Sequence, residues 1–406
     1  MAGMSKSRAE KWLTPIALAI GLPIVVVAGV IYYMSVTARP LHPNPLEVTS
    51  VIESPPLPRW TSAVEQARKY VRAGLTEQNL PGIAAAVGVG DDIVWAEGFG
   101  WADVEKRSPV APATRFRIGH VSKALTSAAV GLLLEQGRLH LEDEIQTYVS
   151  AFPKKQWPVT LRQLMGHTAG LRHYPGEYAD VPKGHCERAS EGLKTFADSP
   201  LLFEPETKSS YSTYGWVLVS AAVEAAAGES FFTFMQTKIF TPLGMTGTLP
   251  DSLTESIPNR ATPYFSRFSG DNLFGVNEAP TVDYSCFAGA GAFLSTPSDL
   301  VRFGIAMNGG AMLKPSTVRM LQTPQQLASG KETDFGLGWT VETVPLAGEP
   351  TRLASDASRS LFGGSASFLI FPDRGIVVAL TTNTSYAALR PVALQIAEAF
   401  VEKKVR

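Results

Sequence analysis

The stretch that decides the fold is residues 114–137, TRFRIGHVSKALTSAAVGLLLEQG. From residue 121 to 135 nearly every side chain is apolar or small, and Lys123 carries the only charge before Glu135. An amphipathic helix would show polar residues on one face, so this pattern predicts a helix that is buried on all sides and ends at Gly137. A buried ammonium needs a partner or a lowered pKa, whereas a lysine at a helix end can reach solvent. Lys123 is therefore either a site residue or a helix-end lysine that extends to water.

The letters before this lysine resemble the first motif of the serine β-lactamase and penicillin-binding-protein superfamily, and above all its class C β-lactamase-like branch with the LACTB-type proteins. That motif is S-x-x-K, in which a serine nucleophile opens a buried helix and a lysine follows one turn later on the same face. This chain has H-V-S-K at 120–123 and no S-x-x-K anywhere, so the resemblance puts His120 at the nucleophile position. Ser122 lies about 200° around the helix from His120 and should point into the packing.

A second segment resembles the Y-x-N motif of the same superfamily. Here it is Tyr211-Ser212-Thr213, followed by a helical pattern that Gly228 ends. The resemblance implies that Tyr211 is the catalytic tyrosine and that Thr213, in place of the asparagine, contacts substrate. In the family the tyrosinate or the lysine takes the proton of the nucleophile and passes one to the leaving group. A nearby positive charge favours the ionised form of a tyrosine, so we expect Lys123 to lower the pKa of Tyr211.

The third motif of the superfamily, K-[ST]-G or H-x-G, is missing from its expected place. Counting back from Gly363 gives Ala-Ser-Arg at 357–359, or Asp-Ala-Ser at 356–358 after a one-residue shift. Neither version has the lysine or histidine, or the glycine that lets substrate lie against the strand. Ser358 and Arg359 are the substrate-binding candidates of this segment, and a divergent loop exposed to solvent is the alternative.

The resemblance covers about residues 60–400 and implies an α+β, two-lobed fold of the β-lactamase/transpeptidase type. An antiparallel sheet flanked by helices forms one lobe, and residues near 140–300 form a mainly helical second lobe. The residues themselves predict a helix over about 62–74 that opens with a capping box from Ser62 to Glu65. They also predict a hairpin of strands 83–89 and 93–99, a closing hairpin of strands 367–372 and 376–383, and a final helix over 386–406.

The N-terminal segment predicts one transmembrane helix ahead of this domain. Residues 12–38 contain no charged side chain, and about 20 apolar residues are enough to cross a bilayer. Basic residues precede this segment and none of it is acidic, so the positive-inside rule places residues 1–11 in the cytoplasm. The competing interpretation is a cleavable signal peptide, although the apolar run exceeds the usual 7–15 residues.

Six prolines follow within residues 39–59, which predicts an extended linker between the membrane and a domain of residues 60–406. This arrangement places the protein in the inner (cytoplasmic) membrane as a single-pass protein with its C-terminal domain in the periplasm. The membrane, through residues 12–38, is thus one expected partner.

Composition narrows the remaining functions. A net charge of −1 without a basic run argues against nucleic acid as a partner. Cys186 and Cys286 form either one disulfide, if the domain is exported, or two unpaired thiols. His167, His173 and His185 lie near Cys186 but do not follow the spacing of a zinc site, and a histidine between helix and loop more often satisfies backbone groups. We therefore expect neither a metal nor a cofactor.

Function follows from the resemblance and from its two departures. The resemblance implies acyl transfer to, or hydrolysis of, an amide or ester of a small-molecule or peptide-like substrate. With His120 in place of the serine and the third motif missing, we expect catalysis to be impaired or absent. The hypotheses are a non-catalytic protein that binds a peptide or acyl ligand, a histidine that itself attacks activated esters, and a substitute nucleophile in Ser122. A different class of function is a domain that docks a protein partner in the periplasm and leaves the site unused. The natural ligand and the oligomeric state stay open.

Overall fold

The centre of the fold is an antiparallel sheet with strand order β1-β3-β2-β13-β12-β11-β10, and the short β4 pairs with the far end of β3. The computed structural model describes residues 10–174, 184–253, 256–268, 270–360 and 363–401, and only the backbone of 10–20 and 357–360. The strands of this sheet are β1 (Ser50–Ile52), β2 (Gly82–Val89), β3 (Asp92–Asp103), β4 (Ser108–Pro109), β10 (Thr340–Leu346), β11 (Glu349–Ser360), β12 (Gly364–Phe371) and β13 (Ile376–Thr382).

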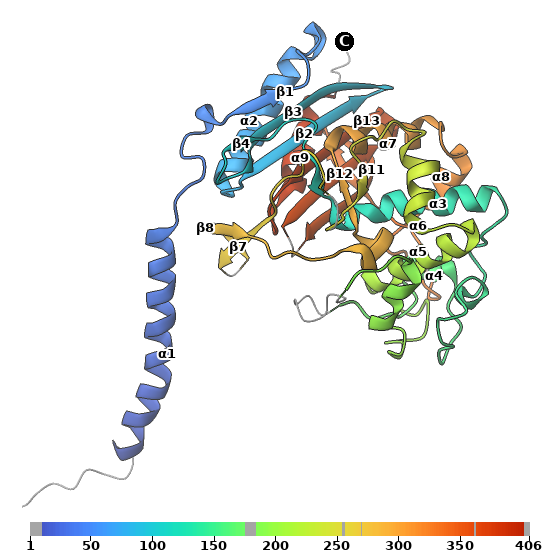
Figure 1. Ribbon diagram of the computed structural model, residues 1–406, viewed down its shortest axis with the longest axis horizontal. Helices are drawn as coiled ribbons and strands as arrows, with labels where there is room; N and C mark the ends of the chain where they lie inside the picture. The colour runs from blue at the N-terminus through green and yellow to red at the C-terminus, as the bar shows by residue number, and fades with distance from the viewer. Residues whose placement is uncertain (1–9, 175–183, 254–255, 269, 361–362, 402–406) are drawn as a thin grey trace, which may run out of the picture.

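Helices cover both faces of the sheet. Helices α2 (Thr61–Glu77) and α9 (Leu389–Ala399) pack on one face, and α7 (Pro297–Gly309) packs on the other (Figure 1). The sequence of strand β2 is apolar without alternation. Val87 packs with α2 and α9 on one face of the sheet, and its neighbour Ala86 packs in the core on the opposite face. A strand buried on both faces needs apolar side chains at every position.

The two predicted hairpins are confirmed. Strands β2 and β3 are longer than the predicted segments, and β12 begins three residues before its predicted start at 367. The predicted capping box is wrong, because α2 begins at Thr61 after the N-cap Trp60, which makes no side-chain cap bond. The Glu65 carboxylate instead accepts a hydrogen bond from Arg68 at 2.5 Å. The final helix is shorter than predicted and ends at Ala399, and residues 402–406 lie outside the described part of the chain.

The helical lobe appears in green and yellow at the lower right of Figure 1. Its α-helices are α4 (Leu161–Met165), α5 (Thr213–Ala227) and α6 (Phe231–Phe234). Among the described residues a 3₁₀ helix, η6 (Ala189–Thr195), precedes α5, and a short π-helix, η7 (Met235–Phe240), continues α6. The region near 140–300 is not purely helical, because it also contains the hairpin of β7 (Tyr264–Phe268) and β8 (Asp271–Glu278). A small sheet of β5 (Phe116–Arg117), β9 (Phe293–Ser295) and β6 (Leu249–Pro250) adjoins it.

The helix that the opening stretch predicts is α3 (Ser122–Glu135), preceded by the single turn η3 (Gly119–Val121). Of its fourteen residues, all of the first ten are buried, as is Leu133. Gly137 follows with a φ of 67°, the left-handed conformation of a helix stop. The prediction of a helix buried all round is therefore confirmed, and α8 (Pro315–Leu321) lies against its later part.

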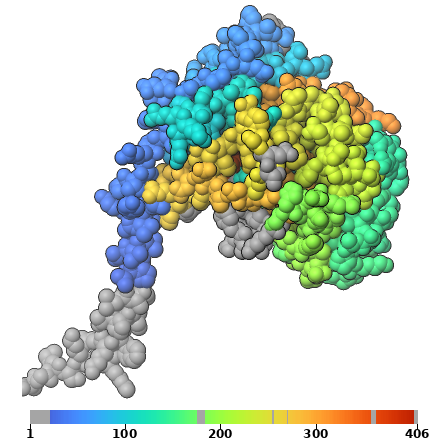
Figure 2. Space-filling model, viewed as in Figure 1, coloured from blue at the N-terminus to red at the C-terminus, as the bar shows by residue number. Residues whose placement is uncertain are grey.

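At the N-terminus, α1 (Glu10–Thr37) stands apart from the domain in Figures 1 and 2. Within the described residues no single helix is both long and apolar enough to cross a membrane, and the apolar part of α1 there is Gly21–Thr37. A bent pair, α5 with the helix up to Phe240, meets the length and composition criteria, but α5 is buried in the domain. The span over 12–38 therefore stays a prediction.

The segment after α1 is tied to the domain instead of forming a free linker. The His42 ring nitrogen lies 2.9 Å from the carbonyl oxygen of Pro81, and the Leu41 amide donates to Asn79. Strand β1 then pairs with β3 as the edge of the main sheet. Prolines open two short 3₁₀ turns here, Pro45–Glu47 and Pro58–Trp60, so the segment is not extended throughout. They do not prevent docking, because the intervening residues supply the hydrogen bonds.

Candidate active site

The residues of the first motif lie at the start of the buried helix. His120 sits in the turn η3 and is half-buried, whereas Lys123 is the second residue of α3 and only 4% exposed. Ser122 is fully buried, and its hydroxyl has no hydrogen-bond partner among the described residues. Ser122 therefore points into the packing, as its angular position predicts, and is not open to a substrate.

The second motif meets the first at the start of α5. Ser212 caps this helix by accepting a hydrogen bond from the Gly215 amide at 3.1 Å, which fixes the residues on either side of it. The Thr213 hydroxyl oxygen then lies 3.4 Å from Nε2 of His120, and the rings of Tyr211 and His120 are 5.5 Å apart. The structure thus brings His120, Lys123, Tyr211 and Thr213 together, although their roles stay predictions.

Lys123 has a buried partner, Asp356. In the sequence, this residue belongs only to the alternative placement of the third motif at 356–358. The Nζ of Lys123 lies 3.2 Å from one carboxylate oxygen of Asp356 and 3.4 Å from the other. The same Nζ lies 4.6 Å from the centre of the Tyr211 ring. Burial acts to lower the pKa of Lys123, but the Asp356 carboxylate and Tyr211 outweigh it and raise that pKa above its ordinary value. Lys123 is therefore a fixed ammonium and not a proton acceptor at neutral pH.

The expected shift of Tyr211 is wrong in direction. Burial raises the pKa of Tyr211 above its usual value, and the opposing effect of the Lys123 ammonium is smaller. Asp356 adds to the rise because its negative charge disfavours a second anion nearby. The sequence reveals neither the burial of Tyr211 nor the carboxylate beside Lys123, and together these outweigh the effect of the ammonium. Tyr211 is a neutral phenol at neutral pH.

Two further histidines, which the sequence analysis weighed as metal ligands or as residues that satisfy backbone groups, pack against Tyr211. The ring centres of His167 and His173 lie 4.6 and 5.2 Å from that of Tyr211. Each uses its Nδ1 to accept a backbone amide at the start of α5, from Ser212 and Thr213 respectively, both at 3.2 Å. An accepting Nδ1 carries no proton, so both rings are held as the neutral tautomer.

Burial and the Lys123 charge act in the same direction on these rings. They hold the pKa values of His120 and His167 well below the usual range and lower that of His173 to about 4. The three imidazoles are therefore neutral at pH 7. The T-A-G letters after His167 were the available sequence signal, because they place this histidine in a turn, and its φ of 60° confirms an unusual backbone there.

The remaining predicted substrate-binding residues lie on β11. Ser358 and Arg359 pair in register with Ala366 and Ser365 of β12, so the segment is a strand of the main sheet and not a loop. Their side chains are outside what the structure describes. Asp356, two residues earlier on the same strand, is the member of this segment that reaches the site.

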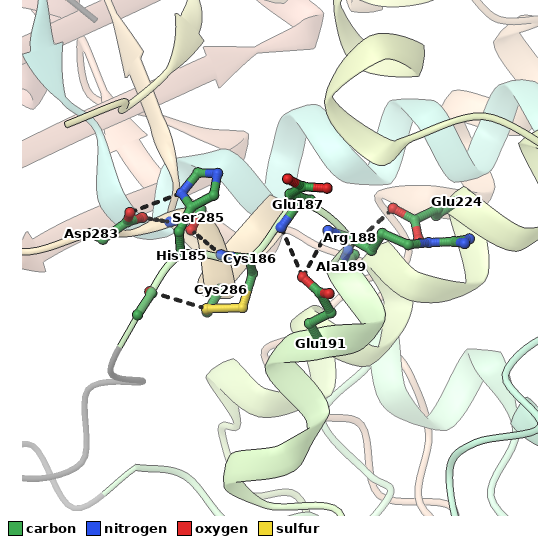
Figure 3. Close-up of a disulfide and its surroundings, with 11 residues drawn as sticks. His185, Cys186, Glu187, Arg188, Ala189, Glu191, Glu224, Asp283, Ser285 and Cys286 are labelled. Atoms are coloured by element: carbon green, nitrogen blue, oxygen red, sulfur yellow. Dashed lines mark hydrogen bonds and ion pairs between the residues drawn. A yellow bond between two sulfur atoms is a disulfide. The ribbon is translucent and has the colours of Figure 1, made fainter. Parts of the chain in front are cut away.

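The cysteines and His185 lie apart from these side chains. Figure 3 shows the disulfide Cys186–Cys286, whose Cα atoms are 4.9 Å apart, joining the segment after residue 184 to the turn Ser285–Ala290. His185 pairs with the Asp283 carboxylate at 2.9 Å. Of the two alternatives for the cysteines, the structure therefore shows the disulfide. Cys186 is not a candidate metal ligand because its sulfur is part of that bond.

Chemically, this arrangement offers a neutral imidazole at the predicted nucleophile position, a paired ammonium and a neutral phenol. The imidazole can accept a hydrogen bond or attack an activated acyl group. Neither the ammonium nor the phenol can serve as the general base that activates a hydroxyl at neutral pH.

Comparison with protein families identifies the chain's relatives. A family model described as Beta-lactamase matches residues 67–400. The chain belongs to the β-lactamase family. Among curated proteins it is similar to the serine β-lactamase-like protein LACTB, mitochondrial, of Homo sapiens, with 30% identity over 86% of this chain and 81% of the human protein. The penicillin-binding protein 4* of Bacillus subtilis is 28% identical over 64% of this chain and 59% of its own.

Solved structures agree on the fold. The D-amino acid amidase of Ochrobactrum anthropi superposes with a TM-score of 0.70 at 21% identity, covering 84% of this chain and 98% of its own. The penicillin-binding protein homologue of Pyrococcus abyssi gives a TM-score of 0.69 at 22% identity over 82% of this chain and 76% of its own. At these identities the likeness concerns the fold alone. The predicted β-lactamase/transpeptidase-like α+β fold is confirmed.

Proposed function

We propose that the protein is a membrane-anchored, extracytoplasmic member of the β-lactamase family that binds a peptide-like or acyl ligand beside His120 and does not form an acyl-serine. The observation that carries the proposal is the pairing of Lys123 with Asp356 next to a histidine at the nucleophile position. One departure replaces the serine, and the other places Asp356 beside Lys123, which keeps this lysine protonated and unable to activate a hydroxyl. Losing the nucleophile of a triad-type hydrolase costs on the order of 10⁶ in rate, so a surviving function should rest on binding.

A second candidate is hydrolysis of activated esters by His120 itself. The neutral state of its ring and its half-buried position favour this reading, because only an unprotonated, reachable imidazole is nucleophilic. Amides and β-lactams are poor targets for it, since a neutral imidazole has little power to expel an amine. Ser122 is a poor alternative nucleophile because it is fully buried.

The location is supported by two independent features. The uncharged residues 12–38 follow basic residues, and α1 presents exposed apolar side chains from Leu22 to Val36. The disulfide Cys186–Cys286 fits an oxidising compartment, since such bonds are rare in the cytosol. We therefore place the domain on the periplasmic side of the cytoplasmic membrane.

The function is tested on the full chain in detergent, as wild type and as His120→Ala. Each is mixed with a chromogenic short-chain ester, a chromogenic cephalosporin and a fluorophosphonate, and turnover and intact mass are measured. Binding is measured in parallel by thermal shift with D-phenylalanine amide, a probe of the amide class. We expect no turnover and no added mass, with a raised melting temperature in the presence of the amide.

Each hypothesis has its own outcome in that experiment. Ester turnover by wild type that His120→Ala abolishes would establish the histidine as a nucleophile. Phosphonate addition to wild type at a serine would overturn the non-catalytic proposal. A matched control is His140→Ala, because His140 is exposed and lies beyond the far end of α3.

A further inference from the structure

The hairpin β7–β8 is an apolar element that the proposed function does not use. It forms a two-stranded sheet separate from the main one. Leu273 is 54% exposed, and the half-exposed residues that accompany it are Phe265, Phe268, Phe274 and Val276. The rings of Phe268 and Phe274 pack edge to face with centres 5.8 Å apart. Two strands alone are marginal in water, and grouped exposed apolar side chains mark a surface that contacts something else.

This hairpin lies against the end of α1. The Arg267 guanidinium donates to the Thr37 hydroxyl at 3.3 Å, and β8 contacts the last turn of the helix. A pocket between them is lined by Ala38, Arg39, Arg267 and Phe274, among others. Figures 1 and 2 show the same arrangement, with the gold hairpin beside the blue end of α1. The hairpin therefore lies beside the point where α1 ends.

The tyrosines of α1 mark a level along this helix. Tyr32 and Tyr33 are 69% and 59% exposed and come at the end of the apolar run. Tyrosine is enriched where a spanning helix leaves the hydrocarbon, because its ring is apolar and its hydroxyl is polar. From Tyr33 to Thr37 the helix rises about 6 Å, so the contact between Arg267 and Thr37 falls at headgroup depth.

We propose that the β7–β8 hairpin is a second membrane contact, which places Leu273 and Phe274 in the interface of the lipid bilayer that α1 enters. The inference rests on the proposed membrane anchor. Arg39 is exposed and has no ion pair among the described residues, so it can face lipid phosphates. Asp271 and Glu278 add negative charge to the hairpin. The contact is therefore mainly apolar and does not need anionic lipid. With one anchor at α1 and one at the hairpin, the domain has a fixed tilt on the membrane.

The test uses the full chain in vesicles of phosphatidylcholine with the native disulfide intact. Leu273→Cys and a matched control, Leu202→Cys, are each labelled with the environment-sensitive fluorophore NBD. Leu202 suits this purpose because it is 60% exposed and lies in the helical lobe. Lipids that carry a quencher just below the headgroup are then added at increasing fraction. We expect at least twofold stronger quenching, and a blue-shifted emission, at position 273 than at 202.

The same vesicles are extracted with alkaline carbonate, which separates the two proposals. If the protein resists extraction but position 273 is quenched no more than 202, the hairpin contact is overturned and the anchor stands. If carbonate releases the protein, the anchor itself fails, and the hairpin contact that rests on it fails with it. A third label at Asn277→Cys, an exposed position on β8, reports which part of this strand lies deeper in the bilayer. Quenching at 273 that exceeds quenching at 277 supports insertion of the Leu273 side, and the reverse order overturns it.

Discussion

Two buried carboxylates of this protein hold cations in different ways. Asp251 contacts Nε of Arg117 at 2.6 Å and the guanidinium of Arg260 at 2.6 Å. Asp356 contacts the ammonium of Lys123 at 3.2 Å. The Arg117 guanidinium also lies 4.7 Å from the centre of the Tyr284 ring, so this cation is covered by an aromatic face as well as paired.

The surroundings of the two carboxylates differ, and this difference assigns one to stability and the other to the candidate site. The Asp251 cluster links β5 to the residue that follows β6, through short contacts with two arginines. The Asp356 pair is longer, is surrounded by neutral imidazoles, and adjoins the half-buried His120 and Tyr211. Burying a charge pair is costly, so a pair is weak evidence for stability. We infer that Asp251 holds the fold and that Asp356 sets the charge state of the site.

The largest expected loss of stability comes from removing the Asp251 carboxylate. Asp251→Asn leaves two arginines without their carboxylate and should lower the free energy of unfolding by about 3–5 kcal/mol. Denaturant unfolding of the full chain in detergent measures this loss. The control is Asp373→Asn, which removes an exposed carboxylate and should change stability by less than about 0.5 kcal/mol. Equal stability of the two variants would remove the structural role assigned to Asp251.

The next largest loss of stability comes from removing the Asp356 carboxylate, the partner of Lys123. Asp356→Asn should cost less, about 1–3 kcal/mol, because Lys123 can lose its proton when its partner is gone. The pKa of Lys123 should then fall, which ¹³C NMR of ε-labelled lysine measures, with Lys123→Met to assign the signal. The raised pKa of Lys123 stabilises the folded state fully below its unfolded value, about 10.4, and this contribution is lost as pH rises through the folded value. An unchanged Lys123 titration in Asp356→Asn would disprove the charge-setting role.

These two pairs also show where sequence reasoning succeeds and where it stops. Helix α3 was predictable because a run of small and apolar residues specifies burial locally, and Lys123 follows His120 by one turn. Asp356 was not, because it is 233 residues away and reaches Lys123 only through the register of β11, where it pairs with Phe368. A one-residue shift in such a register turns a side chain to the opposite face. Sequence counting alone left that shift open.

The same limit explains the errors at the domain's start. The capping box from Ser62 to Glu65 satisfied a local pattern, but Arg68 competes for the Glu65 carboxylate and also binds the buried Glu97. The proline-rich linker was read from composition, whereas β1 joins the sheet through backbone pairing that composition does not report. His167 and His173 reach Tyr211 because backbone amides at the start of α5 orient them, and the local sequence does not report this tertiary contact.

A smaller effect is the pH dependence of stability that the histidines near Lys123 cause. His173 has a pKa of about 4, and those of His120 and His167 are also lowered, against about 6.5 in the unfolded chain. Between pH 6.5 and 4 the unfolded state therefore binds more protons, so stability should fall as pH falls. We expect a melting temperature several degrees lower at pH 5 than at pH 7. His173→Gln should reduce that slope, whereas the exposed His140→Gln should leave it unchanged.

The smallest expected effect on stability is that of His120→Ser. His120 is half-buried, and its one described hydrogen-bond contact, to Thr213, is long at 3.4 Å, so the change should be within about 0.5 kcal/mol. A loss of several degrees in melting temperature would mean that the ring is packed as part of the core. The same variant separates the two departures of the site, because it supplies the missing hydroxyl but leaves Lys123 paired with Asp356.

We therefore expect His120→Ser alone to stay inert toward a chromogenic ester and a fluorophosphonate. His120→Ser with Asp356→Asn should turn over the ester and gain phosphonate mass at residue 120, because the unpaired lysine can then accept the serine proton. The control is His120→Ser with Asp373→Asn, which removes an exposed carboxylate. Activity in His120→Ser alone would mean that the Asp356 pair does not silence the lysine. In that case both buried carboxylates would be structural, and the distinction between the two pairs would be lost.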